Sequence, residues 1–490
     1  MTATTEATAS RPTTGPPAHP AYPALRWLTL ATFVVILNET LMVNAIPRLM
    51  AQFEVTAGAA QWLSTAFMLT MAVVIPATGW FLQRVTTRHA FAVAMAVFCA
   101  GTMLAAAAPT FWVLVLARVI QAGGTAVMLP LLMTTLMTTV PEHDRGRVMG
   151  NVTLAISVAP ALGPTAAGLV LQVTGWRWLF LVVLPIAAGV AVAALRRLEN
   201  VGETRATSVD GASVALAALG FGALVYGLSG FGGSTSGVVS PWVYVAAGLA
   251  VVGAFAYRQV RRQEHPHGPL LDLRTLTHRT FTLAVVLQAI AFLTLMGAMI
   301  LLPLYLQGLR GLTPLQTGLL VAPGGLAMGL AGPHIGRAFD RWGARPLTVP
   351  GSLCLAGGLT GLAFVGDQTA YPVLVGVHLV IMSGLALIMT PAFTISLGSL
   401  PMSLYAHGSS LLGTVQQVAA AVGTALSVTV LTLRSTALTS VGASPAEAFV
   451  GGFRWAFAVA AALAVATVVL ALVLPGRATP SVDAPVPTTH

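Results

Sequence analysis

The sequence predicts an all-α integral membrane protein with about fourteen membrane-spanning helices. Its composition indicates that lipid is the surrounding solvent, because 56% of the 490 residues are hydrophobic and only 8% are charged. A soluble domain typically carries about 25% charged residues. In addition, apolar stretches of about 20 residues, the length that crosses a bilayer, recur along the whole chain. These observations exclude an ordinary soluble fold.

The predicted spans follow one another with short connections. By length and hydropathy we expect them at residues 27–47, 61–82, 90–109, 111–139, 146–171, 178–197, 211–230, 241–258, 279–305, 315–337, 346–366, 370–397, 407–433 and 453–474. The two ends of the chain, residues 1–26 and 475–490, are rich in Pro, Thr and Ala and are predicted to be disordered tails. An even number of spans places both tails on the same side of the membrane.

The arginines predict which side that is. All 24 basic residues are Arg, a composition typical of a GC-rich bacterial genome. With the N-terminus inside, the cytoplasmic loops hold Arg84, Arg88, Arg145, Arg147, Arg196, Arg197, Arg205, Arg258, Arg261, Arg262, Arg274, Arg279, Arg337, Arg341 and Arg345. The outer side then holds only Arg48, Arg177, Arg310, Arg434 and Arg454. Because cytoplasmic loops are enriched in positive charge, both termini are expected in the cytoplasm, with the protein in the bacterial plasma membrane. The net charge of +10 reflects these orientation signals and does not indicate nucleic acid.

Two short motifs repeat at equivalent places in this topology. Residues 79–88, following the second span, resemble residues 336–345 following the tenth. Residues 175–180, which open the sixth span, resemble residues 452–457, which open the fourteenth. Two similar six-helix halves are a common plan of secondary transporters, with the solute site between them. The chain is therefore expected to comprise an N-terminal six-helix bundle at 27–197, two inserted helices with flanking loops at 198–278, and a C-terminal six-helix bundle at 279–474.

The fuller copy of the first motif contains Gly336, Asp340, Arg341, Gly343 and Arg345. It resembles the inner-loop motif of the major facilitator superfamily, and the resemblance runs from the first span to the last. More narrowly, the chain is similar to the fourteen-helix drug:proton antiporters of the EmrB/QacA type, and residues 37–40 and 405–409 resemble the lincomycin-resistance-protein (LmrB-like) subgroup. This resemblance implies the major facilitator fold and transport by alternating access, with no catalytic residues.

The two copies of the motif are predicted to gate the inner face. Glycines let helices approach closely, while Asp340 and Arg341 are expected to form an ion pair that latches the closed face. Such a latch biases the two states of the transporter. In the first copy, Gln83 replaces the Asp, so Gly79, Gln83 and Arg84 are expected to form a weaker latch or one that depends on hydrogen bonds. The alternative is a solvated loop that only sets orientation.

Glu39 is the only carboxylate predicted deep within a span. A charge there costs at least about 2.5–3.5 kcal/mol on insertion scales, so it indicates a functional site. Arg118 lies at a similar predicted depth, roughly 10–12 Å below the outer end. The resemblance implies that Arg118 belongs to the proton-coupling machinery, and we predict that Glu39 carries the proton. A fixed structural ion pair is the alternative. Many relatives carry Asp at the position of Asn38, and a shift of one residue turns the acid by about 100°, toward a neighbouring helix instead of the cavity.

The fifth predicted span carries small residues and prolines. Gly150, Gly163, Pro164 and Gly168 resemble the motif that marks antiporters within the superfamily, where it is taken to seal the path. Pro160 and Pro164 permit a kink. Ordinary tight helix packing through small residues is the alternative interpretation.

Four side chains are predicted to line a solute cavity: Asn38, Met42, Gln121 and Gln417. Gln121 lies on the same helix face as Arg118, and Met offers an adaptable apolar surface. His378 occupies the place in the C-terminal half that corresponds to Arg118, and we interpret it as a structural histidine.

No metal, nucleotide or other cofactor is expected, and the absence of Lys excludes the usual phosphate-binding loop. The leading hypothesis is a secondary active transporter that exports hydrophobic or cationic drug-like compounds in exchange for protons. Its partners would be a small-molecule substrate, protons and the bilayer, and it would act as a monomer. One alternative is a dedicated facilitator that exports one metabolite, such as a self-made antibiotic, lipid or amino acid. A polytopic enzyme or sensor is a further alternative, although no catalytic cluster is present in the loops.

Overall fold

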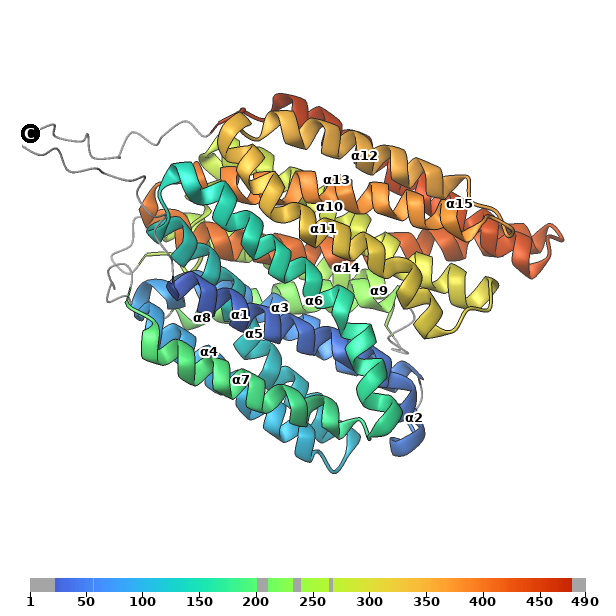
Figure 1. Cartoon of the computed structure of the whole chain (residues 1–490), viewed down its shortest axis with the longest axis horizontal. Coiled ribbons are helices and arrows are strands. Elements are labelled where there is room, and N and C mark those ends of the chain that lie inside the picture. Colours follow the sequence, from blue (N-terminus) through green and yellow to red (C-terminus); the bar gives the residue numbers. More distant parts are fainter. Residues whose placement is uncertain (1–22, 56, 201–209, 232–238, 264–267, 478–490) are drawn as a thin grey trace, which may run out of the picture.

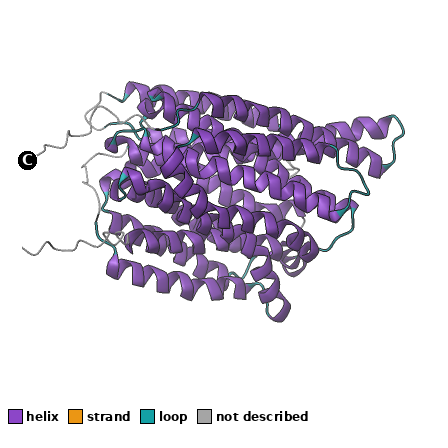
Figure 2. Ribbon diagram, turned by 45° about the horizontal axis from the view of Figure 1, so that its top comes forward, coloured by secondary structure: helices purple, strands orange, loops and turns teal. Residues whose placement is uncertain are grey.

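A computed structural model describes residues 23–55, 57–200, 210–231, 239–263 and 268–477. Within these residues the secondary structure is helical and contains no strand, and the long helices run side by side in one bundle (Figures 1 and 2). The prediction of an all-α protein is confirmed.

The helices follow one another in the predicted order. The N-terminal half consists of α1 (Pro23–Leu41), η1 (Met42–Ala45), α2 (Ile46–Phe53), α3 (Ala57–Arg84), α4 (Thr87–Ala107), α5 (Phe111–Thr139), η2 (Glu142–Asp144), α6 (Arg145–Val173) and α7 (Arg177–Arg197). The inserted pair is α8 (Gly211–Gly230) and α9 (Pro241–Arg261). The C-terminal half consists of η3 (Leu273–Thr277), α10 (Arg279–Leu304), the π-helical turn η4 (Tyr305–Leu309), α11 (Pro314–Trp342), α12 (Arg345–Ala363), α13 (Tyr371–Gly398), η5 (Met402–Leu404), α14 (Tyr405–Ser440) and α15 (Pro445–Val473).

Thirteen helices of the described chain are long and apolar enough to cross a membrane. Helix α6, with 29 residues, is not among these thirteen, so the predicted fourteen spans are reached only when α6 is included. The first predicted span, 27–47, is not one continuous α-helix, because α1 ends at Leu41 and the chain passes through η1 into α2. The last helix begins at Pro445 instead of the predicted residue 453. Ser444 and Glu447 form a capping box at this observed start.

Two large hydrophobic clusters fill the interior of the bundle. Phe98 of α4 and Phe180 of α7 belong to the first cluster, which also reaches Phe281 of α10 and Tyr405 of α14. Leu359 of α12 and Phe457 of α15 belong to the cluster in the C-terminal half. Large apolar side chains such as Trp112, Leu169 and Val469 are exposed along the helices, which fits helices that face lipid.

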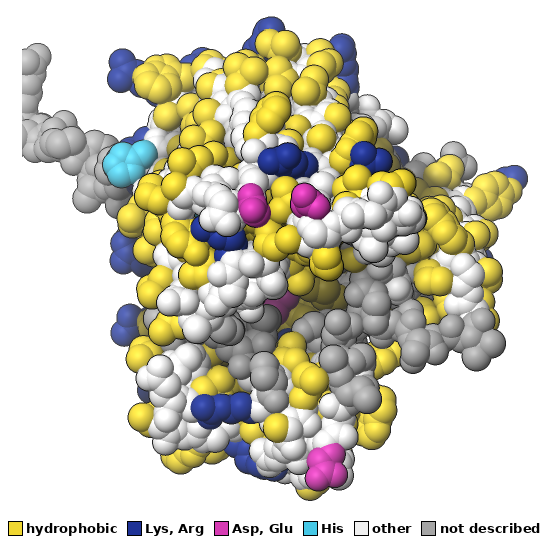
Figure 3. Space-filling view, turned by 90° about the vertical axis from the view of Figure 1, so that its right-hand side faces the viewer, with side chains coloured by type: hydrophobic (Ala, Val, Ile, Leu, Met, Phe, Trp, Pro, Cys, Tyr) yellow, Lys and Arg dark blue, Asp and Glu magenta, His cyan; other side chains and the backbone are white. Residues whose placement is uncertain are grey.

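The bundle has two ends that are used below as reference points. The terminal face is the end at which α1 begins and α15 ends, on the left of Figure 1, and the distal face is the opposite end. Figure 3 looks onto the distal face, which is hollowed at its centre between two groups of helices. The positive-inside count predicts that the terminal face is cytoplasmic.

The inserted helices lie on one side of the junction between the halves. Helix α8 packs against α3 of the N-terminal half and α14 of the C-terminal half, while α9 packs mainly against α8. The backbones of α8 and α9 approach closely at Gly248, where an added Cβ would lie 2.6 Å from the amide nitrogen of Leu224. This position therefore requires glycine.

Candidate functional site

Glu39 lies in the last turn of α1 and is partly exposed. Within the described chain its carboxylate forms no hydrogen bond and no ion pair within 4.0 Å. The adjacent Asn38 is buried, and its side-chain nitrogen has no hydrogen-bond partner among the described residues. Of these two neighbouring polar residues, Asn38 is the more enclosed and Glu39 keeps partial exposure.

Arg118 is held at the centre of the N-terminal half. Its guanidinium is 1% exposed and donates to the Gln121 side-chain oxygen at 2.9 Å and to the Leu63 carbonyl at 3.5 Å. It also lies over the Phe67 ring, 4.1 Å from the ring centroid. Gln121 in turn donates to the Thr102 hydroxyl at 2.8 Å. A buried guanidinium is tolerated only with such partners, so this network fixes the Arg118 side chain in place.

Glu39 and Arg118 are close enough for their charges to interact, although they do not form a direct ion pair. The structure therefore brings together the acid and the arginine that the sequence singled out, and it leaves the carboxylate without a fixed partner. Among the described residues, no ion pair joins Glu39 to Arg118 in this conformation.

Helix α6 makes close contacts on two sides. A Cβ at Gly163 would collide with the Thr40 side chain of α1, whereas Gly168 has open space around it. Ala159 and Ala167 are fully buried. The side chains of Pro160 and Pro164 lie outside the described residues. Small residues thus allow α1 and α6 to pack closely, but Gly168 does not take part in that packing.

Near the terminal face, α6 and α11 join the two halves backbone to backbone. A Cβ at Gly332 would lie 2.6 Å from the Gly150 carbonyl oxygen, and a Cβ at Gly336 would collide with the Gly146 carbonyl. No side chain fits at these positions. The two halves are therefore in direct contact along this seam.

Asp340 closes the end of the α6–α11 seam. Its two carboxylate oxygens accept hydrogen bonds from the backbone amides of Gly146 and Arg147, each at 2.7 Å. These amides belong to the first turn of α6, where backbone N–H groups lack helical partners and favour a negative charge. The predicted Asp340–Arg341 ion pair is wrong for this conformation: Arg341 lies over the Trp342 ring instead.

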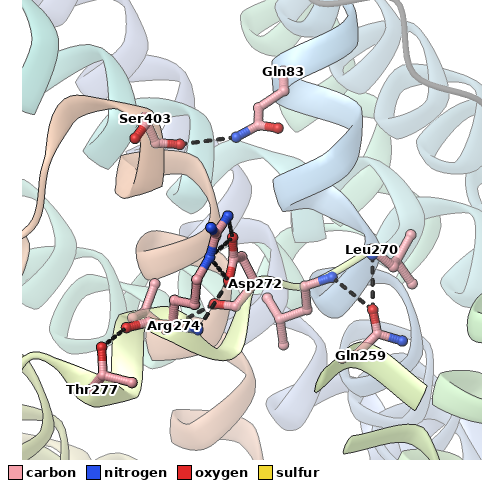
Figure 4. A network of polar contacts seen from close by, with 9 residues as sticks. Gln83, Gln259, Leu270, Asp272, Arg274, Thr277 and Ser403 are labelled. Atoms are coloured by element: carbon pink, nitrogen blue, oxygen red, sulfur yellow. Dashed lines mark hydrogen bonds and ion pairs between the residues drawn. The ribbon is translucent and has the colours of Figure 1, made fainter. Parts of the chain in front are cut away.

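The second seam, between α3 and α14, carries the other copy of the motif. Gly79 lies against His407, where an added Cβ would be 2.9 Å from the His407 Nδ1 atom. The Thr78 and Ser410 hydroxyls are hydrogen-bonded at 2.7 Å. Gln83 donates to the Ser403 carbonyl at 3.1 Å (Figure 4). The first copy therefore contacts the C-terminal half through hydrogen bonds, and its role as a latch stays a prediction. Arg84 lies over the Trp80 ring.

The remaining motif residues contact the end of the chain. Gly343 has φ +84°, a conformation that favours glycine, and the Ala344 amide donates to the Gly476 carbonyl at 2.6 Å. Arg477 donates to the Arg341 carbonyl at 3.1 Å. Arg345 is exposed. The first residues of the predicted disordered tail 475–490 thus pack against the gating loop, and residues 478–490 lie outside the described chain.

The predicted cavity residues are unequally placed. Gln417 is partly exposed, whereas Asn38, Met42 and Gln121 are buried. His378 is also buried and packs against Gly324 of α11. None of the four predicted cavity residues lines the open groove of about 630 Å³ between α1 and α6. In this conformation, Gln417 is the member of the set with a surface that a solute could reach.

Sequence reasoning missed two polar features. Gln288 of α10 is 1% exposed, and neither its side-chain nitrogen nor its oxygen has a hydrogen-bond partner within the described chain. An amide inside an apolar span was the signal that could have identified it. The other feature is the Asp272–Arg274 pair at the terminal face, which lies in a loop and gave no pattern in the sequence.

The chain matches a family profile and two bacterial transporters over most of its length. The Major Facilitator Superfamily profile matches residues 28–424. The chain is 38% identical over 452 residues to the uncharacterized MFS-type transporter YcnB of Bacillus subtilis, which covers 91% of this chain and 93% of that protein. It is 35% identical over 451 residues to the lincomycin resistance protein LmrB of the same species, covering 90% and 93%.

Among solved structures, the human organic anion transporter MFSD10 superposes with a TM-score of 0.67 at 15% identity, covering 93% of this chain and 100% of that one. At that identity the likeness concerns the fold alone. The relatives at 35–38% identity and the profile match over most of the chain establish the family to which the sequence belongs. The chain therefore belongs to the major facilitator superfamily and is a multi-pass membrane transporter rather than an enzyme.

Proposed function

We infer that the protein exports hydrophobic or cationic drug-like compounds in exchange for protons, by alternating access. The observation that carries this proposal is Glu39, a partly exposed residue whose carboxylate accepts no hydrogen bond from the described part of the chain and lies within electrostatic range of the buried Arg118. A carboxylate in a membrane interior costs free energy, so a protein keeps one there when it has a function. Exchange of a proton is a function that requires the carboxylate to lack a fixed partner.

The two seams at the terminal face support alternating access. Contacts between the halves are tight at Gly150–Gly332 and Gly79–His407, while the opposite end of the bundle is hollowed (Figure 3). This conformation faces the distal side, which is the outside if both termini are cytoplasmic. Glu39 would bind a proton from the outside in this state and release it to the cytoplasm after the terminal face opens.

Protonation would control the change between the two states. A neutral carboxyl costs less to bury than a carboxylate, so a protonated Glu39 allows the cavity to close around it. Once Glu39 is deprotonated, its charge is attracted to Arg118, and a bound cationic or polarisable solute can replace the proton near the carboxylate. Arg118 cannot move far, because Gln121 and Leu63 hold it.

The class of cargo is inferred from the relatives. LmrB is named for resistance to lincomycin, and export of antibiotic-like compounds from the cytoplasm of a bacterium would give such resistance. We propose the same role here, for a monomer in the plasma membrane with both termini in the cytoplasm.

A Glu39→Gln variant tests the proposal. Efflux of a panel of dyes and antibiotics would be measured in cells, with and without a proton uncoupler, and proton movement would be followed in vesicles. Glu39→Gln should insert normally but lose uncoupler-sensitive efflux by at least about tenfold, since 1.4 kcal/mol already changes a rate tenfold. Glu447→Gln is the matched control, because Gln preserves the capping box at this exposed position. Uncoupler-sensitive efflux that persists in Glu39→Gln contradicts the proton role.

A second candidate is a dedicated exporter of one compound class, which the name of LmrB favours. A substrate panel distinguishes the two functions. A dedicated exporter should give resistance to one chemical class only, whereas a multidrug exporter should give resistance to several unrelated classes.

A further inference from the structure

The segment that connects the inserted helices to the C-terminal half is buried, although it is neither an α-helix nor part of a span. Residues 269–275, called the strap below, run along the terminal face between α9 and α10. Leu270 and Leu271 are each 1% exposed, and Asp272 is 2% exposed. Connecting loops normally lie on the surface with their backbone exposed, so burial of this segment calls for an explanation.

The inserted helices anchor the strap through Gln259 of α9. The Gln259 side-chain oxygen accepts from the amides of Leu270 at 2.8 Å and Leu271 at 3.3 Å, and its nitrogen donates to the Ser213 hydroxyl of α8 at 2.8 Å. Gln259 is 0% exposed. Figure 4 shows the bond between Gln259 and Leu270. With the bond to Ser213, one fully buried amide ties both inserted helices to the strap.

The Asp272–Arg274 pair fixes the shape of the strap. The Arg274 Nε atom donates to an Asp272 carboxylate oxygen at 2.9 Å, and the Arg274 amide donates to the other oxygen at 2.9 Å (Figure 4). Burial raises the pKa of the Asp272 carboxyl, but these hydrogen bonds outweigh it and hold that pKa below its ordinary value. The carboxyl is therefore charged at neutral pH.

The strap lies beside the α3–α14 seam. Its η3 turn packs against α9, α10 and α14, and Asp272 lies within electrostatic range of His407. Leu270 and Leu271 belong to a hydrophobic cluster that contains residues of both halves, among them Tyr405 of α14, and Phe81 of α3 packs against this cluster. This is the seam at which Gln83 replaces the acidic residue of the gating motif and provides a single hydrogen bond to Ser403.

We propose that the strap, anchored by the inserted helices through Gln259, holds the terminal face closed at the α3–α14 seam, with Asp272 and Arg274 as its positioning residues. Opening of this face separates α3 from α14, so the strap must give up its contacts with one half. The inserted pair then has a defined role, which is to set the balance between the two states of the transporter. This inference rests on the proposed alternating access.

The test measures the opening of the terminal face directly, independently of transport. In full-length protein with Cys99→Ser and Cys354→Ser, a Ser409→Cys probe is introduced. Ser409 is 4% exposed and is hydrogen-bonded to Thr134 across the halves at 3.0 Å, so it is protected while the face is closed. The protein is placed in lipid nanodiscs, where both faces are accessible, and the rate of maleimide labelling is recorded.

Asp272→Asn keeps an oxygen that can cap η3 but removes the charge, and Gln259→Leu removes the anchor. Each variant should raise the labelling rate at least fivefold. Arg274→Gln should do the same without disturbing a core, because the Arg274 side chain is 55% exposed. Arg279→Gln, an exposed arginine at the start of α10, is the control for loss of a positive charge and should leave the rate unchanged.

The proposed role of the strap is overturned if Asp272→Asn, Gln259→Leu and Arg274→Gln all fold and are all labelled at rates within twofold of that of the Ser409→Cys parent. A rate that rises equally in the Arg279→Gln control overturns it as well. Because labelling reports conformation and not export, these outcomes leave the proton exchange at Glu39 untouched, and a failure of Glu39-dependent efflux leaves the labelling result intact.

Discussion

Asp340 of α11 accepts a hydrogen bond from the backbone amide of Gly146, at 2.7 Å, across the junction between the two halves of the protein. A side chain at the end of one half thus caps a helix of the other half. The bond can exist only while α6 and α11 are in contact at the terminal face. It is therefore a lock whose removal should change the equilibrium between the two conformations.

Asp340→Asn should weaken this lock. Asn retains one acceptor oxygen, but its NH₂ group would face the second amide, from Arg147, and the charge at the α6 N-terminus is lost. Hydrogen bonds to charged groups contribute about 1.5–3 kcal/mol, so the open population should rise roughly tenfold or more. Spin labels at the exposed positions 88 and 345, on opposite halves, would report the open population as a longer distance between the labels.

The control is Asp367→Asn, because Asp367 is an exposed acid near the distal end of α12. An unchanged distance distribution in Asp340→Asn would show that the seam closes without this carboxylate.

Gly332→Ala should force the same seam apart by a different mechanism. The added Cβ would lie 2.6 Å from the Gly150 carbonyl oxygen, a backbone atom that cannot move away alone. Overpacking typically costs about 1–3 kcal/mol, and here the closed state alone bears the cost. Export should fall, and the label distance should increase. Gly357→Ala is the matched control, because Gly357 of α12 has open space around it. If both alanine variants behave like the parent, the close approach of α6 and α11 is not required for closure.

The sequence was sufficient to predict the class of fold and to identify Glu39 and Arg118 as charged residues within helices, and the reason is physical. Lipid tolerates only long apolar helices, and a charge inside one is rare enough to be noticed. The partner of Asp340 could not be predicted, because backbone amides carry no sequence signature. The pattern of the motif suggested Arg341, its neighbour in the chain, whereas the true partners are 194 and 193 residues away. The strap escaped prediction for the same reason, since its partners lie on α9, α10 and α14.

Gln288→Leu should raise stability and slow export. The buried Gln288 amide has no hydrogen-bond partner for either polar atom, and such a group costs about 1–3 kcal/mol. Leu is of similar size and removes that cost, so the temperature of thermal unfolding in detergent should rise by several degrees.

A natural protein keeps such a residue when a solute or an ordered water forms hydrogen bonds with it, so efflux by Gln288→Leu should fall at the same time. Gln417→Leu provides a comparison at a partly exposed position, where no gain in stability is expected. A Gln288→Leu protein with unchanged stability would indicate that the amide is already satisfied by water.

Asp210→Asn should destabilise the inserted helix pair in a pH-dependent way. Asp210, just before α8, accepts from the Arg258 guanidinium at 2.9 and 3.0 Å and is paired with Arg262 at 2.8 Å. The hydrogen bond from Arg258 is the largest of the effects that hold the pKa of the Asp210 carboxyl well below its usual range. A carboxyl whose pKa is lowered by folding stabilises the folded state above its ordinary pKa of about 3.9, and that contribution declines as the pH falls from there toward the folded value. At pH 7 and pH 5 the wild-type protein should therefore unfold at a higher temperature than Asp210→Asn. A loss of about 2 kcal/mol of folding free energy corresponds to a difference of a few degrees. This difference in unfolding temperature should shrink below about pH 4. Thermal unfolding of both proteins in detergent at these pH values provides the measurement. A difference that stays constant down to pH 3 would show that the carboxylate charge is not the source of the stabilisation.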